Sequence, residues 1–298
     1  MGIDGGTGRG VEGMEFRIGE RGILRVLETM GDETSIVEAA RVSYGKGTRK
    51  SSDDAKLIRY LWRHGHTSPF EMCEIKFFVK APMDVWRQWV RHRTASINEY
   101  STRYSEVEME FEAVNGKWRR QSSRNRQGSD GMLVGDRFDD LTARERDLYA
   151  RAWRLYEDGL AAGVAREQIR RVLPLCTYTT AYWKCDLRNV FHFLSLRLAD
   201  TAQTEIREYA KSMAEAIKVW VPNAWAAFEE YTLNAVRFSG TEVELVGLLL
   251  RGDRDGFWNR LVALGWADSE KRGWSDDRLA LEFSEKLNKM ADVSLFAI

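Results

Sequence analysis

The chain has 298 residues, with 45 Lys or Arg and 45 Asp or Glu, so its formal net charge at pH 7 is zero. With 44% hydrophobic residues, it is long enough to bury one or two cores, which excludes a wholly disordered chain. The zero balance argues against a protein held along DNA by a general basic field, but it leaves room for a local basic patch. The basic residues are 33 Arg and only 12 Lys, and Arg is the side chain suited to bidentate contacts with phosphate or carboxylate.

Cysteine usage and the length of the apolar runs indicate a reducing compartment. The three cysteines, Cys73, Cys176 and Cys185, form no C-x-x-C pair and are too few for a disulfide scaffold. No apolar stretch approaches the roughly 20 residues that a membrane-spanning helix needs, and the first residues lack the apolar core of a signal peptide. We therefore expect a cytoplasmic protein with no membrane partner.

Hydrophobic periodicity predicts a mixture of strands and helices in the first third of the chain. Residues 71–79 carry the clearest pattern, because apolar side chains recur at every second position and predict a half-buried strand. The other predictions, in chain order, are a flexible glycine-rich tail over 1–14, a strand over 23–27, a helix over 32–42, a helix that starts at 51–54 and stops at Gly65, and a helix from Pro82 to about His92.

The rest of the chain predicts mainly helices. Residues 117–135 are polar and rich in Arg, Ser and Gly, which predicts a long loop. Thr142, with Glu145 three residues later, forms a capping-box pattern and predicts the start of a helix. The following predictions are a strand over 174–185, a helix capped by Asp186, helices over 203–220 and 223–236 on either side of Pro222, and a charged helical tail beyond Gly240.

The densest polar group of the sequence lies at residues 91–104, directly after a helix with two tryptophans on its buried stripe. One interpretation is a capped helix end followed by a solvated loop. The other is an anion site, in which Arg91, Arg93 and nearby hydroxyls hold phosphate oxygens while Glu99 accepts from a sugar or base. The residues alone leave both interpretations open.

Arg197 lies in an otherwise apolar run, residues 193–199. An Arg that faces a core needs a partner, which is either an acidic side chain or an anionic ligand. The pattern alone favours a structural partner, Asp200 or Glu205.

The remaining reactive side chains give little sign of nucleophilic or metal chemistry. Cys73 and Cys185 have apolar or aromatic neighbours, among which a thiol is usually inert, and Cys176, close to Arg170 and Arg171 in the sequence, is the only candidate nucleophile. The four histidines share no metal-ligand spacing, so we expect no metal. The chemistry of a phosphate-binding protein of this kind would have to come from a cofactor.

The segment Arg91-His92-Arg93, followed after seven residues by Ser101, matches the R-H-R-x7-S signature of the flavin-dependent thymidylate synthases. The chain resembles that family over about residues 15–235. Further matching segments occur in the order typical of the family: AARVS at 39–43, GHTSPFE at 65–71, EQIRRVLP at 167–174 and LRNVFHFLSLR at 187–197.

The resemblance implies an α+β fold, a twisted antiparallel sheet flanked by helices. It implies a synthase domain over 15–236, with the tail 1–14 before it and a helical extension over 237–298 after it. It further implies an FAD-dependent methyltransferase of dTMP biosynthesis that converts dUMP to dTMP without a cysteine nucleophile. Its co-substrates would be 5,10-methylenetetrahydrofolate as carbon donor and NADPH as reductant, and its assembly a homotetramer with active sites shared between subunits.

The resemblance also implies residue roles. It makes Arg197 the catalytic residue, whose guanidinium stabilises charge on the pyrimidine as the N3 proton leaves, and this replaces the structural interpretation of that residue. FAD contacts are implied at Ser68, Arg91, His92, Arg93, Glu99, Asp186, Leu187, Arg188 and His192. Contacts with dUMP are implied at Gln88, Trp89, Val90, Arg91, Glu99, Tyr100, Ser101, Thr102, Arg103, Arg170 and Arg197.

Two positions depart from the family pattern, and other functions stay open beside the leading one. Asp186 stands where many relatives carry Asn, and a carboxylate cannot donate the hydrogen bonds of an amide. Thr201 stands where His is common.

The alternatives to a thymidylate synthase are a binding protein for single-stranded nucleic acid, with arginines interleaved with aromatic residues, and a flavoprotein of this fold that has lost methyl transfer. The extension would either pack as extra helices or provide a regulatory or assembly contact.

Overall fold

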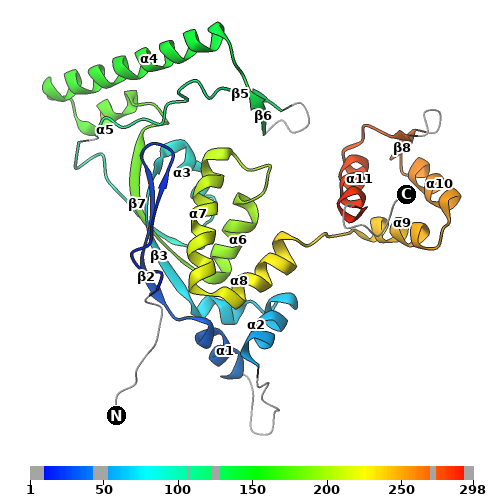
Figure 1. Cartoon of the computed structure of the whole chain (residues 1–298). Coiled ribbons are helices and arrows are strands. Elements are labelled where there is room, and N and C mark those ends of the chain that lie inside the picture. The colour runs from blue at the N-terminus through cyan, green and yellow to red at the C-terminus, as the bar shows by residue number, and fades with distance from the viewer. Residues whose placement is uncertain (1–9, 43–52, 107, 123–127, 269–272, 292–298) are drawn as a thin grey trace, which may run out of the picture. The chain divides into compact units, whose positions relative to one another are not determined.

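An antiparallel sheet of five strands organises the first of the two units into which the chain divides, Met1–Leu233 and Asn234–Ile298. The computed structural model, shown in Figure 1, describes residues 10–42, 53–106, 108–122, 128–268 and 273–291. Every strand pair in this sheet is antiparallel. The strands lie in the order β1 (Glu15–Ile18), β2 (Gly22–Met30), β3 (Glu74–Pro82), β7 (Tyr178–Asp186) and β4 (Ser96–Glu99).

The central strand β3 follows the predicted alternation. Ile75, Phe77 and Val79 are buried, whereas the residues between them are partly exposed. Phe77 lies opposite Trp183 of β7 in the sheet register. The predicted strand over 174–185 starts later, at Tyr178, because residues 174–177 form a turn closed by a hydrogen bond from the Thr177 amide to the Pro174 carbonyl.

Helices cover the sheet, and Figure 1 shows α6 and α7 side by side against it. Asp186 caps α6 as predicted, because its carboxylate accepts from the Asn189 amide at 2.9 Å. Asp53 caps α2 in the same way, while Ser51 and Ser52 lie outside the described residues. The helices of this layer are α1 (Glu33–Val42), α2 (Asp54–Arg63), α3 (Met83–Trp89), α6 (Leu187–Arg197), α7 (Thr204–Trp220) and α8 (Pro222–Phe228).

Two predictions for the middle of the chain are wrong. Residues 117–135 are not simply a loop, because they contain the hairpin of β5 (Arg119–Gln121) and β6 (Ser129–Met132). Thr142 is not an N-cap, because α4 (Asp136–Ala161) starts six residues earlier. The Thr142 side chain is instead buried, donates to the Phe138 carbonyl and accepts from the Trp118 indole.

Two helix ends also differ from the predictions. α3 ends at Trp89 rather than near His92, so the basic segment follows the helix instead of forming its last turn. The predicted helix over 223–236 is shorter, since α8 ends at Phe228 and continues only as a π-helical turn over Glu229–Leu233. The short helix α5 (Arg166–Ile169) and the 3-10 turns Ser68–Met72 and Arg170–Val172 complete the first unit. The predicted class, an antiparallel sheet flanked by helices, is confirmed.

The second unit has a hydrophobic core of its own. Ser239 caps the first helix of this unit with a reciprocal capping box, in which Glu242 accepts from the Ser239 amide. The buried core residues are Leu245, Phe257, Leu261, Trp266, Ala267, Ala280 and Phe283. The elements are α9 (Gly240–Leu250), α10 (Arg254–Ala263), β8 (Ala267–Asp268), β9 (Gly273–Trp274) and α11 (Arg278–Ala291). The helices therefore bury their apolar faces against one another.

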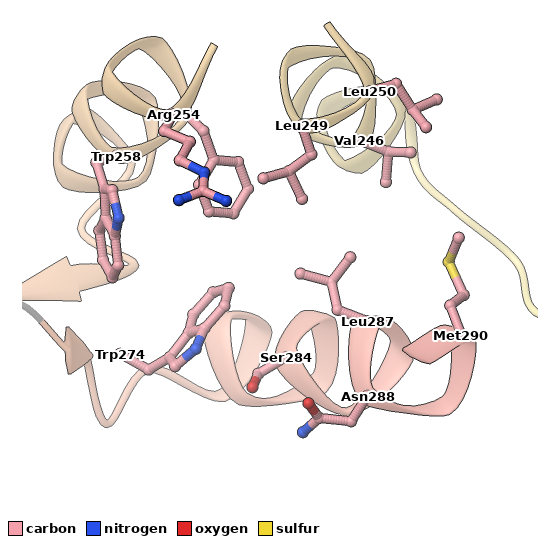
Figure 2. Close-up of a pocket in the computed structure, with 11 residues that line it drawn as sticks. Val246, Leu249, Leu250, Arg254, Trp258, Trp274, Ser284, Leu287, Asn288 and Met290 are labelled. Carbon is pink, nitrogen blue, oxygen red and sulfur yellow. The ribbon is translucent and has the colours of Figure 1, made fainter. Parts of the chain in front are cut away.

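A cavity of about 350 Å³ lies between α9, α10 and α11 of this second unit. Figure 2 shows aliphatic side chains of α9 and α11 facing each other across it, with Trp258, Trp274 and Arg254 at one end. Within the described residues, no helix of either unit combines the length and the hydrophobicity needed to cross a bilayer.

Candidate active site

The segment with the R-H-R motif is anchored by the aromatic core that precedes it. Trp89, the last residue of α3, is fully buried. Its ring lies 5.7 Å from that of Trp183 on β7 and 4.8 Å from that of Phe193 on α6. Residues 91–93 therefore follow directly after a helix end that is packed against both the sheet and α6.

Arg197 is held at the end of α6 by two contacts with this segment. Its Nε donates to His92 Nε2 at 3.1 Å, and its Nη2 donates to the Gln88 carbonyl oxygen at 3.0 Å. Neither acidic side chain expected as a structural partner accepts from Arg197 among the described residues: Asp200 pairs with Arg207 and Glu205 with Arg119. The guanidinium thus keeps its charge without a carboxylate to neutralise it.

His92 is a neutral imidazole in this environment. Burial, followed by the charges of Arg197 and His192, lowers its pKa to about 4. Because Nε2 accepts from Arg197, the proton of the neutral ring must lie on Nδ1. That Nδ1 is buried and has no hydrogen-bond partner in the described part of the chain. A buried donor without an acceptor is costly, so this site suits a ligand that brings an acceptor.

Three arginines surround a cavity of about 230 Å³ next to His92. Arg188 at the start of α6 is oriented by Asn189, whose Oδ1 accepts from it at 2.8 Å. The residues lining the cavity are Arg91, His92, Arg93, Thr94, Arg188, Asn189 and His192. The three guanidinium groups and the unpaired Nδ1–H of His92 are donors that suit the pyrophosphate of a dinucleotide cofactor.

Asn189 and Thr94 are not among the residues implied from the sequence. Asn189 could have been found, since it is the third residue after the cap Asp186, the position whose backbone amide donates to the cap side chain. Thr94 gives no local signal.

The other residues implied for FAD lie at several places of the first unit. Ser68 starts the 3-10 turn and lines a different cavity, of about 450 Å³, together with His66. Both carboxylate oxygens of Asp186 bind Asn189 within the chain. Leu187 is fully buried, and its backbone amide donates to the Cys73 carbonyl at 2.8 Å. Glu99, at the end of β4, accepts from Thr179 at 3.0 Å.

The residues implied for dUMP form two groups within one chain. Gln88, Trp89, Val90 and Arg91 lie at the end of α3 beside Arg197, but the Trp89 side chain is buried and can contribute only its backbone. The second group consists of residues 100–103, which follow β4, and Arg170 of the 3-10 turn Arg170–Val172; its members after β4 are Tyr100, Ser101, Thr102 and Arg103. Within it, Arg170 donates to the Thr102 hydroxyl at 2.9 Å.

The three cysteines are poor nucleophiles in this structure. Burial raises the pKa of Cys73 to about 12 and raises those of Cys176 and Cys185. All three are free thiols. Since the thiolate is the reactive form, none of them is activated at neutral pH.

Alkylation of the cysteines is therefore expected to leave intact the dUMP-dependent activity that the family resemblance implies. Treatment with iodoacetamide at neutral pH should change turnover by less than about twofold, because the thiols stay protonated. Comparison of the treated protein with an untreated sample and with the variant Cys176→Ala would measure this. Rapid inactivation that dUMP prevents would contradict the expectation.

The low pKa of His92 predicts a specific dependence of stability on pH. The unfolded chain binds a proton at a histidine near pH 6.5, whereas folded His92 does so only near pH 4. The contribution of His92 to the free energy of unfolding is therefore fully present above about pH 6.5 and is lost as the pH falls toward about 4. Between pH 6.5 and pH 4, the melting temperature of the variant His92→Asn should therefore fall by less than that of the unmodified protein.

Melting curves with excess FAD at several pH values would test this. Glu112, whose pKa burial raises to about 7, titrates in both proteins and so cancels in the comparison. Parallel curves for the two proteins would show that His92 is protonated in the folded state.

Comparison with known proteins places this architecture in a family. The sequence profile of the Thy1 family, described as thymidylate synthase complementing protein, matches residues 25–223. A flavin-dependent thymidylate synthase of Thermus thermophilus is 52% identical over 231 residues, which cover 77% of this chain and 84% of that protein. The flavin-dependent thymidylate synthase of Gluconobacter oxydans is 49% identical over 271 residues, which cover 90% of this chain and 87% of that protein. This last match reaches into residues 237–298, because residues 1–236 are less than four fifths of the chain.

A solved structure agrees with the sequence matches. The UMP/dUMP methylase PolB from Streptomyces cacaoi, crystallised with 5-Br dUMP, superposes with a TM-score of 0.63 at 30% identity, covering 73% of this chain and 98% of that one. The family match includes strands β3, β7 and β4 of the sheet and helices α3 and α6, next to which lie the R-H-R segment and Arg197. The chain belongs to the family of flavin-dependent thymidylate synthases, and it is an enzyme, a methyltransferase.

Proposed function

We propose that this protein makes dTMP by reductive methylation of dUMP, with FAD as bound cofactor and with 5,10-methylenetetrahydrofolate and NADPH as co-substrates. The observation that carries the proposal is the placement of Arg197, held by His92 and the Gln88 carbonyl, next to the cavity of three arginines. Bound FAD would supply the hydride transfer, because protein side chains do not carry out this chemistry.

Arg197 is the residue to which we assign the activation of the pyrimidine. Uracil is a weak carbon nucleophile, and a guanidinium next to the ring stabilises the negative charge that builds up on it in the reaction. Arg197 suits this role because the two groups that accept its hydrogen bonds are a neutral ring nitrogen and a backbone carbonyl. Its charge is thus available to the ligand, and desolvation strengthens its electrostatic effect.

We assign the other arginines to phosphate binding. Arg91, Arg93 and Arg188 line one cavity and would hold the flavin pyrophosphate. Arg170, oriented by Thr102, would bind the dUMP phosphate together with Arg103. The Arg103 side chain is 55% exposed and pairs with Glu167 at 3.3 Å, a contact weak enough to exchange for a substrate phosphate.

A homotetramer with shared active sites is part of the same proposal. What supports it is an exposed apolar stripe on α4, in which Leu141, Leu148 and Leu155 recur at intervals of seven residues and are 37%, 61% and 53% exposed. Leucines at this spacing form the seam of packed helices, and a row of them in water favours association. The free cysteines fit a cytoplasmic location.

The colour of the purified protein separates this proposal from nucleic-acid binding. A flavoenzyme should be yellow, and dUMP should change its flavin absorbance at low and high salt alike. A nucleic-acid binder should be colourless and lose its ligand steeply with salt. A colourless protein that takes up no added FAD would contradict the proposal.

A further inference from the structure

Gln203 lies at the start of α7, where a side chain usually accepts a hydrogen bond from a backbone amide of the first turn. It is the N-cap residue of α7, but its side chain makes no capping hydrogen bond. Ser, Thr, Asp and Asn stabilise this position, and Gln does not belong to that group. A residue that breaks a local rule in a well-formed fold is often kept for a functional reason.

The Gln203 amide is used instead to bind a residue of the candidate active site. Its Oε1 accepts a hydrogen bond from Nε2 of Gln88. The backbone carbonyl of the same Gln88 accepts from Arg197. Gln203, although 115 positions away in the sequence, therefore contacts the residue that holds the catalytic arginine.

Two carboxylates determine which end of the Gln203 amide faces Gln88. Asp84 and Glu205 line one cavity together with Gln203, and the Gln203 amide favours the ionised form of both carboxyls. A carboxylate can only accept, so the NH2 group of Gln203 must face these two acids and its oxygen must face Gln88. Glu205 is fixed in turn by Arg119 of β5, at 2.6 Å.

The same logic sets the orientation of Gln88. Because its NH2 group donates to Gln203, its own oxygen Oε1 is left to accept from another group. Gln88 is partly exposed. Gln88, whose backbone carbonyl holds Arg197, therefore has a side-chain acceptor, and not a donor, to offer a ligand.

We propose that Gln203 is a positioning residue that selects uracil over cytosine by holding the Gln88 amide with its oxygen toward the pyrimidine. This rests on the proposed binding of dUMP beside Arg197. Uracil carries a hydrogen at N3 and can donate it, whereas N3 of cytosine is an acceptor and would face the Gln88 oxygen unpaired. Without Gln203, the Gln88 amide can turn over and accept either base.

The experiment titrates the FAD-loaded enzyme with dUMP and with dCMP and follows the flavin absorbance. The variants are Gln203→Ser, which removes the amide but supplies a good N-cap, and Gln203→Met, which keeps the side-chain length. Gln88→Ala and the double variant complete a cycle, and Lys211→Ala, an exposed change on α7, is the control. Melting temperatures are measured for all of them.

For Gln203→Ser and Gln203→Met we expect the Kd for dUMP to rise about tenfold, the effect of one hydrogen bond, while the Kd for dCMP stays the same or falls. The serine variant should melt no lower than the unmodified protein, because it caps α7. In the Gln88→Ala background the further change at position 203 should have almost no effect.

Unchanged dUMP affinity in both variants would overturn the proposal. So would equal weakening of both nucleotides together with a lower melting temperature, which indicates a purely structural role, or full additivity with Gln88→Ala. If the unmodified enzyme binds FAD but not dUMP, the proposed function fails first, and the two failures are thereby distinguished.

Discussion

Replacing Arg197 with alanine is expected to lower dTMP formation by about two to three orders of magnitude while the protein stays yellow. Removal of one preorganised group that stabilises transition-state charge typically costs this much. FAD should remain bound because the cavity of about 230 Å³ is lined by other arginines, Arg91, Arg93 and Arg188. The pairing of Arg197 with neutral His92 also means that its loss leaves no unpaired carboxylate behind.

Steady-state turnover and flavin content, measured on the same preparation, test this prediction. Arg197→Lys should also be impaired, since an ammonium group cannot contact both His92 and the Gln88 carbonyl as the guanidinium does. Arg278→Ala, at a side chain 90% exposed in the second unit, is the matched control and should be fully active. Turnover above half of the normal value for Arg197→Ala would remove this residue from the mechanism.

The second large effect is expected at Trp89, whose replacement by alanine should destabilise the first unit by about 3–5 kcal/mol. The ring is fully buried and contacts Trp86, Trp183, Phe193 and Tyr209. For a unit of this size, that loss lowers the melting temperature by roughly 6–20 °C. Because the R-H-R segment directly follows Trp89, flavin affinity should fall as well.

Thermal unfolding followed by flavin release and by circular dichroism would measure both effects. Trp89→Phe keeps part of the buried ring and should lie between alanine and the unmodified protein. A melting temperature that drops by less than about 3 °C in the alanine variant would show that the core does not depend on this ring.

The features that the sequence predicted well depend on contacts between near neighbours. The alternation of β3 was readable because its burial repeats every two residues, and β3 indeed buries Ile75, Phe77 and Val79. The cap at Asp186 was readable because its partner, Asn189, lies three residues away. The R-H-R segment was identified from a contiguous pattern in the same way.

The predictions that failed concern pairings that no local pattern encodes. β5 and β6 are exposed on both faces, so their sequence shows no alternation and predicts a loop. Thr142 and Glu145 match a capping box, but their side chains bind Trp118 and the Val114 amide instead. The partners of Arg197 lie 105 and 109 positions away, and only the folded chain brings them together.

The release of tritium from dUMP labelled at C5 tests the central claim most directly, because the hydrogen at that carbon must leave when the methyl group is installed. The purified FAD-loaded protein is incubated with labelled dUMP, 5,10-methylenetetrahydrofolate and NADPH. We expect tritium in the water in proportion to dTMP formed, and none when the folate is omitted. A yellow protein that oxidises NADPH but releases no tritium would contradict the account and indicate a flavoprotein that has lost methyl transfer.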